Sequence, residues 1–136
     1  MTSEKAITAQ LKNVPLFSQT SAKQRKAIAK IGKTITWKAG SKPIEQGSKA
    51  VAFFLILDGS VEVVRDGTTV AQLGPSHFVG EIALLTGQDR TADVVATEDT
   101  TVYALGRSAF SRAIKADPAM ALVLLSALAE RQASFG

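Results

Sequence analysis

The sequence contains no cysteine and a single histidine, His77, and these two shortages exclude several kinds of chemistry. Without cysteine there is no disulfide framework, thiolate nucleophile, cysteine zinc site or iron–sulfur cluster. One histidine is too few for a multi-histidine metal centre. We therefore expect a protein that is not an enzyme and that holds no metal or cofactor.

Long apolar segments are missing as well. Apolar runs such as residues 51–57 are far shorter than the roughly 18 residues that a membrane-spanning helix needs. Residues 1–5 lack the apolar stretch of a signal peptide. With 136 residues, 46% of them hydrophobic, the chain can bury the core of one domain. We expect a soluble, cytoplasmic, single-domain protein with no membrane span.

The net charge of +4 hides an uneven distribution. Residues 1–50 contain ten Lys and Arg and two acidic residues, whereas residues 51–136 contain six Lys and Arg and ten acidic residues. The basic half suits nucleic acid, an acidic protein or an anionic lipid surface. Because its lysines are spread out with almost no aromatic residues between them, solvated helix and strand faces are the favoured interpretation.

The N-terminal segment, residues 1–32, is expected to form helices. Ser21 followed by Gln24 is a capping-box pattern, in which each side chain bonds to the other residue's backbone N–H. The helix that starts there is expected to stop at Gly32.

The middle of the chain has short runs rich in Val, Ile, Thr and Phe, separated by glycines, which are typical of β-strands. Asp66-Gly67 predicts a two-residue hairpin turn, because that turn requires positive φ at both positions. The strands are expected at residues 34–37, 51–57, 61–65, 69–73, 91–96 and 101–105. With the helices they predict a mainly β fold: a β-roll or jelly-roll barrel over residues 33–107, flanked by N-terminal helices and two C-terminal helices.

Residues 78–92 interrupt the strand pattern. Gly80 introduces residues 81–85, which are long enough for one helical turn whose free N–H groups suit an anion. Arg90 follows nine residues after Glu81, and arginine is well suited to bidentate phosphate binding. An acid that accepts a hydroxyl proton, free amides and an arginine together predict a sugar-phosphate site. The alternative is an ordinary Glu81–Arg90 ion pair with no ligand.

This segment resembles the phosphate-binding cassette of the cyclic nucleotide-binding domain family, whose approximate pattern is F-G-E-x-A-L-L, a short loop and R-T/S-A. Gly40, Gly47 and residues 56–63 are also similar to that family, and the similarity runs from about Val14 through the C-terminal helix. The resemblance implies a β-roll that binds a cyclic nucleotide, with cAMP expected in preference to cGMP.

The resemblance also implies roles for the residues of the cassette. Gly80 allows the backbone to approach the ribose, and Glu81 accepts the ribose 2′-hydroxyl. The amides around Ile82 and Ala83 face the cyclic phosphate, and Arg90 pairs with its exocyclic oxygens. The remaining candidates for the ligand pocket are Val63, Val70, Ala71, Val79, Thr91, Ala92 and Val94.

Residues 108–136 are expected to form two helices. Ser108 is expected to cap the first and Asp117 the second, whose first residue is Pro118. The second helix has a broad apolar face, which suits a lid over bound ligand, an effector protein or self-association. The candidate lid residues are Leu122, Val123, Leu125, Ser126 and Arg131.

Two other classes of protein, the cupin enzymes and the DNA-binding regulators, share features with this sequence. The cupins share a glycine-punctuated β-roll but bind metal through several histidines and a carboxylate, which one histidine cannot supply. Many relatives append a helix-turn-helix after the last helix, where this sequence ends, so we expect no DNA-binding domain in the chain. The sequence is compatible with three functions: a stand-alone sensor, a regulatory fragment of a transcription regulator, channel or enzyme, and a ligand-free interaction domain of the same fold.

Overall fold

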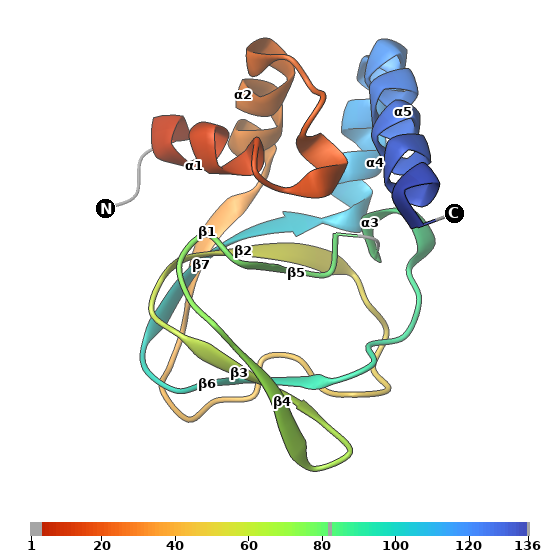
Figure 1. The fold of residues 1–136 in the computed structure, drawn as a ribbon. Helices are drawn as coiled ribbons and strands as arrows, with labels where there is room; N and C mark the ends of the chain where they lie inside the picture. The colour runs from red at the N-terminus through yellow and green to blue at the C-terminus, as the bar shows by residue number, and fades with distance from the viewer. Residues whose placement is uncertain (1–3, 82, 136) are drawn as a thin grey trace. The chain divides into compact units, whose positions relative to one another are not determined.

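The computed structural model describes residues 4–81 and 83–135. They form two units, a β-roll of residues 33–107 and a helical unit made of the segments up to residue 32 and from residue 108 onward. Both units can be followed in Figure 1, and buried apolar residues lie in each of them. The single-domain organisation expected from the sequence stays a prediction.

Two antiparallel sheets make up the roll. Four strands form one sheet in the order β1-β7-β2-β5: β1 (Lys33–Trp37), β7 (Thr100–Gly106), β2 (Ala52–Asp58) and β5 (Phe78–Val79). Three strands form the other in the order β4-β3-β6: β4 (Thr68–Leu73), β3 (Val61–Arg65) and β6 (Asp93–Ala96). The two sheets face each other across the roll in Figure 1, and the expected β-roll with flanking helices is confirmed.

Both sheets contribute to the core of the roll, because alternate residues of a strand face the same side. Trp37, the only tryptophan, is buried there and meets the ring of Phe54 edge-on, with ring centroids 5.0 Å apart. Trp37 therefore belongs to the core of the roll. The buried members of this core are Trp37, Ile44, Ile56, Val61, Val94, Ala96 and Val102.

The hairpin between β3 and β4 has the turn that its sequence predicts. Arg65 pairs with Thr68, and the two residues between them have φ values of 51° at Asp66 and 79° at Gly67. Further along β4 the register shifts, so that Val70 is an extra residue without a partner on β3. This bulge turns Val70 outward, where 51% of its surface is exposed.

Five helical segments form the helical unit. They are α1 (Glu4–Leu11), the 3₁₀ turn η1 (Pro15–Phe17), α2 (Ala22–Ile31), α4 (Arg107–Ala116) and α5 (Pro118–Phe135). In the sequence, α2 ends just before the roll and α4 begins at its end. The capping box of α2 is confirmed: the Gln24 N–H donates to Ser21 Oγ over 3.1 Å, and the Ser21 N–H donates to Gln24 Oε1 over 2.9 Å. The expected capping role of Ser108 is wrong, because α4 already begins at Arg107, directly after β7.

Aromatic and apolar contacts hold the helical unit together. Phe17 of η1 and Phe110 of α4 meet edge-on with ring centroids 6.0 Å apart, and α5 packs against η1. Met120 of α5 is buried, whereas Leu122 and Leu125 are 71% and 61% exposed. One face of α5 therefore carries exposed leucines.

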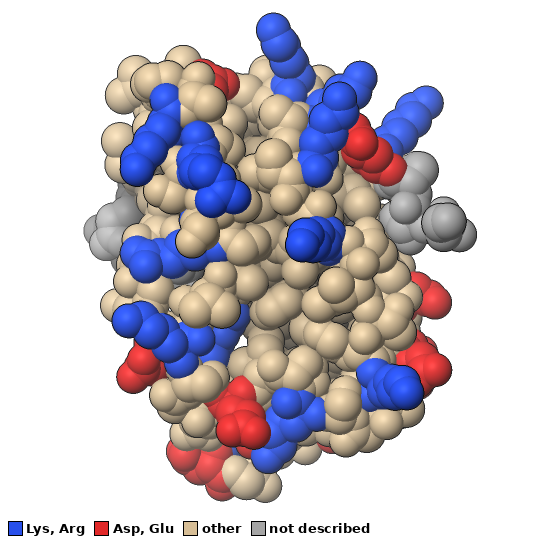
Figure 2. Space-filling model, turned by 180° about the vertical axis from the view of Figure 1, so that it is seen from behind, with Lys and Arg blue, Asp and Glu red and all other residues tan. Residues whose placement is uncertain are grey.

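Charged side chains are scattered over the surface. On the face shown in Figure 2, Lys and Arg are separated by uncharged residues and do not form one continuous patch. On this face, the distribution favours solvated side chains over a dedicated basic surface. In the described part of the chain, no helix has both the length and the apolar character needed to cross a membrane.

Candidate functional site

A pocket of about 220 Å³ opens in the roll, between the cassette and the β3 hairpin. Its floor is apolar, with Val63 of β3 opposite Val94 of β6 in the ladder and Val79 of β5 nearby. The described residues that line the pocket are Ile44, Ala50, Val63, Arg65, Val79, Gly80, Thr86, Gln88, Asp89, Arg90, Thr91, Ala92 and Val94. A pocket with a packed apolar floor and a few polar groups is the usual form of a small-molecule site.

Backbone hydrogen bonds fix the position of Arg90. Its N–H donates to the Ser48 carbonyl over 2.7 Å, and its own carbonyl accepts from the Gly47 N–H over 2.8 Å. Gly47 has a φ of +86°, a conformation that glycine adopts without strain. The loop before β2 therefore holds the backbone of Arg90 from both sides, and only its side chain is free to respond to a ligand.

The Arg90 guanidinium lies in a partly buried position. Its Nη2 donates to the Ala52 carbonyl, and its Cζ lies 5.8 Å from the centroid of the Phe54 ring, over the ring face. Burial lowers the pKa of Arg90 below its ordinary value, because removal from water disfavours the charged form. An anion bound here would offset that loss of hydration with a charge-assisted hydrogen bond.

Gly80 makes room for this guanidinium. Its φ is +83°, and a Cβ built at this position would overlap Nη1 of Arg90 and lie 3.3 Å from the Ala52 carbonyl oxygen. The resemblance implied that Gly80 lets the backbone approach a ribose. In this structure the group that approaches it is the side chain of Arg90.

The cassette continues as a single helical turn, α3 (Ala83–Thr86). The Leu84 N–H donates to the carbonyl of Glu81 over 3.3 Å, and Glu81 itself is only 5% exposed. Arg107 lies at the other end of the turn, where its Nη2 donates to the Leu85 carbonyl over 3.3 Å. A Cβ at Gly87 would lie 2.8 Å from Nη1 of Arg107. Gly87 and Arg107 are therefore a second closely packed glycine–arginine pair, directly after the α3 turn.

Seven of the candidate ligand residues line the pocket: Val63, Val79, Gly80, Arg90, Thr91, Ala92 and Val94. β6 begins at Asp93, later than the strand expected from residue 91, yet Ala92 and Val94 still share the pocket with Arg90.

Of the other five candidates, Val70, Ala71 and Glu81 are not among the described residues that line the pocket. Val70 points outward at the bulge, and Ala71 is partly buried on β4. Glu81 is buried next to Gly80. Ile82 and the side chain of Ala83 lie outside the described residues.

The candidate lid residues lie on α5 in the helical unit. Leu122, Leu125 and Ser126 are exposed there, and Val123 is partly buried. The side chain of Arg131 lies outside the described residues.

Six lining residues were not expected from the sequence: Ile44, Ala50, Arg65, Thr86, Gln88 and Asp89. Arg65 carries a detectable signal, since it lies two residues after Val63 on the same strand and therefore faces the same side. Ala50 lies in the loop before β2, and its N–H donates to the Gln88 carbonyl over 3.2 Å. Pairing between two loops has no signature in the sequence.

The comparison with family models shows the family of this chain. Residues 34–117 match the model of the cyclic nucleotide-binding domain, and this range contains every strand of the roll apart from the first residue of β1. The chain belongs to the cyclic nucleotide-binding domain family. In the described residues no group of three or more His, Cys, Asp or Glu is placed to hold a metal ion.

Curated relatives of this cyclic nucleotide-binding domain include regulatory subunits of cAMP-dependent protein kinase. The subunit from Aspergillus fumigatus is 38% identical over 104 residues, and that from Debaryomyces hansenii is 35% identical over 103 residues. Each match covers 75% of this chain, but only 25% and 23% of the respective relative. The chain therefore spans about a quarter of the length of the curated relatives that it matches.

Two solved structures share the fold of this cyclic nucleotide-binding domain over most of its length. The N-terminal domain of a transcriptional regulator from Streptomyces coelicolor has a TM-score of 0.87 and 26% identity, and the match covers 93% of this chain and 94% of that one. A cyclic nucleotide-binding-like protein from Brucella abortus has a TM-score of 0.75 and 26% identity, with 80% and 97% covered.

Proposed function

We propose that this domain is a receptor for a cyclic nucleotide monophosphate, with cAMP as the ligand, and that it acts as a sensor. The observation that carries the proposal is the Arg90 guanidinium, which is partly desolvated, seated over Gly80 and placed in a pocket with an apolar floor. A cyclic nucleotide combines the two features that this pocket suits, a singly charged phosphate and an apolar base and sugar edge.

The bound phosphate would replace the Ala52 carbonyl as the acceptor for Arg90. A phosphate can accept two parallel charge-assisted hydrogen bonds from a guanidinium, whereas the Ala52 carbonyl accepts one and carries no charge, so the exchange favours the ligand. Val63 and Val94 would then pack against the nucleoside, which adds affinity without a specific hydrogen bond.

The choice of cAMP rests on the relatives, whose names identify them as regulatory subunits of a cAMP-dependent kinase. By the same analogy we infer a regulatory, non-enzymatic role, in which the domain controls an effector protein such as a kinase. A cytoplasmic location and the lid movement of α5 are parts of this proposal.

Calorimetric titration of the purified chain with cAMP, cGMP and 5′-AMP tests the proposal. We expect saturable binding of one cAMP per chain, weaker binding of cGMP, and much weaker binding of 5′-AMP, which lacks the cyclic phosphate. If cGMP displaces cAMP at equal or lower concentration, the choice of ligand is wrong. If neither cyclic nucleotide binds, the chain is instead an interaction domain of the same fold.

A further inference from the structure

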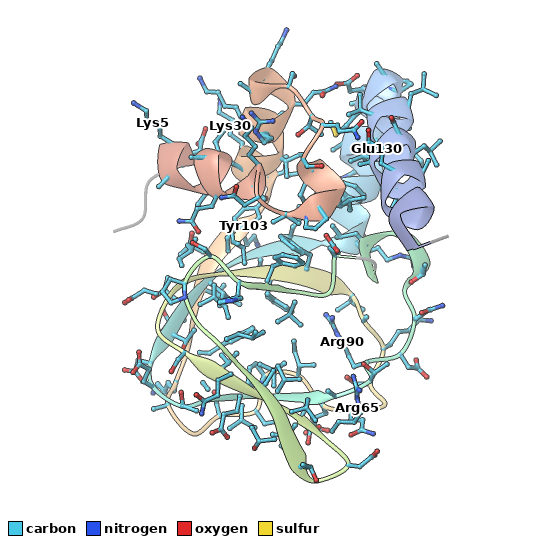
Figure 3. All side chains as sticks on the ribbon, in the orientation of Figure 1. Lys5, Lys30, Arg65, Arg90, Tyr103 and Glu130 are labelled. Atoms are coloured by element: carbon cyan, nitrogen blue, oxygen red, sulfur yellow. The ribbon has the colours of Figure 1, made fainter. Side chains whose placement is uncertain are left out.

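The pocket contains a second cationic side chain, Arg65, on a different element from Arg90. Arg65 is the last residue of β3 and follows Val63 by two positions, so both face the pocket. Its Nε donates to the Thr91 carbonyl over 3.3 Å, at the residue directly after Arg90. Figure 3 shows Arg65 and Arg90 at the same end of the roll, and both line the pocket.

The backbone around Arg65 is held in place before any ligand arrives. The next residue, Asp66, donates its N–H to Gln46 Oε1 over 3.0 Å and accepts from Gln46 Nε2 over 2.8 Å. The Gln46 N–H in turn donates over 2.6 Å to Oδ1 of Asp93, the first residue of β6. The hairpin is therefore tied both to the loop before β2 and to the cassette exit.

The fold does not use the charge of Arg65. Within the described part of the chain its one hydrogen bond is the bond to a neutral carbonyl, and its side chain is exposed. The neighbouring carboxylate of Asp93 is engaged elsewhere, 3.6 Å from Nζ of Lys42. A guanidinium has five N–H donors, and the Nη groups of Arg65 are available to a ligand.

We propose that Arg65 is a second cation for the ligand phosphate, acting beside Arg90. This inference rests on the proposed function. Because Arg65 is exposed, water and salt screen its charge, and its effect on affinity is smaller than that of Arg90.

The test compares Arg65→Gln with Arg65→Lys in the full chain, with Arg112→Gln on α4 as an exposed matched control. Each is titrated with cAMP at low and at high salt, and its melting temperature is measured. Arg65→Gln keeps a donor for the Thr91 carbonyl but removes the charge, whereas Arg65→Lys keeps the charge. We expect Arg65→Gln to weaken cAMP binding about three- to tenfold at low salt and less at high salt. Arg65→Lys and Arg112→Gln should stay within about twofold of the wild type.

The remaining outcomes overturn the inference. If Arg65→Gln binds cAMP as well as the wild type, the charge has no role. If Arg65→Lys loses as much affinity as Arg65→Gln, the bond to Thr91 matters and the charge does not. If the loss of cAMP affinity in Arg65→Gln is the same at low and at high salt, the charge of Arg65 has no role either. A wild-type chain that binds neither cAMP nor cGMP overturns the proposed function itself, and this inference with it.

Discussion

The guanidinium of Arg90 lies in the space that a side chain at position 80 would fill. Gly80 is therefore constrained twice, by its φ of +83° and by the group packed against it. Gly40 has nearly the same φ, +82°, but nothing lies within 4 Å of a Cβ built there. A substitution at either glycine strains the backbone, but only a substitution at Gly80 also collides with Arg90. Comparing the two positions therefore distinguishes the two effects.

Gly80→Ala is predicted to displace Arg90, whereas Gly40→Ala should only strain the backbone. We expect the free energy of unfolding to fall by about 1–2 kcal/mol for Gly40→Ala, and by about 2–4 kcal/mol for Gly80→Ala. Chemical denaturation measures both values, and titration with cAMP should show a loss of affinity for Gly80→Ala alone. Equal losses of stability and unchanged affinity in both variants would mean that Gly80 is needed only for its backbone conformation.

At this scale, the sequence identifies a residue when its role is local. Gly80, Arg90 and Ala92 belong to one short segment, and all three line the pocket as expected. Arg65 can be found by its alternation with Val63 on one strand, whereas Ala50 reaches the same pocket through a loop contact that depends on the tertiary structure. The orientation of Val70 depends on the register of β3 and β4, which no local pattern reveals.

Among the elements, the cassette turn α3 has only four residues and needs support from its neighbours. Arg107 at the start of α4 supplies some of it, through its bond to the Leu85 carbonyl and its contact with Gly87. Its own N–H donates to the Val51 carbonyl over 2.9 Å, next to the residue that binds Arg90. Both arginines therefore join the cassette to the start of β2: Arg90 bonds to its first residue, Ala52, and Arg107 to the residue before it, Val51.

A double-mutant cycle with Gly87→Ala and Arg107→Ala tests this support. The added methyl group collides with Arg107, so the cost of Gly87→Ala should fall when Arg107 is already truncated. We expect a coupling of about 0.5–1 kcal/mol in the free energy of unfolding, and a several-fold loss of cAMP affinity for Arg107→Ala. Additive effects, together with wild-type affinity for Arg107→Ala, would show that this arginine does not position the cassette.

Most of the elements can be predicted from the sequence. The strands of the roll lie within two residues of their expected bounds, because β-branched residues and glycine turns mark them clearly. β5 has only two residues, Phe78 and Val79, and is too short to show a pattern. Ser108 is a favourable cap by residue type, but the continuation of β7 into α4 sets the start of the helix.

Across the whole molecule, the roll contains the pocket and the helical unit contains α5. Leu122 and Leu125 are exposed on α5, although burying leucine is generally favourable. The proposed lid movement gives these side chains a partner when ligand is bound.

Saturating cAMP is predicted to slow amide hydrogen exchange in residues 118–130, because a ligand that binds one position of the helix better shifts it toward that position. Leu122→Ser and Leu125→Ser should leave the melting temperature of the free chain nearly unchanged, since both positions are exposed. Each should weaken cAMP binding by about 1 kcal/mol. Exchange rates and affinities that do not change would exclude a lid role for α5.

Titration of cAMP into the wild type and into Arg90→Ala tests the central claim most directly, with Arg112→Gln on α4 as a control for the loss of an exposed charge. If Arg90 binds the cyclic phosphate in a partly desolvated pocket, Arg90→Ala should lower the affinity about 30- to 1,000-fold, while the control stays at the wild-type value. A melting temperature close to that of the wild type establishes that the variant is folded. A folded Arg90→Ala that binds cAMP within about threefold of the wild type would contradict the proposed site.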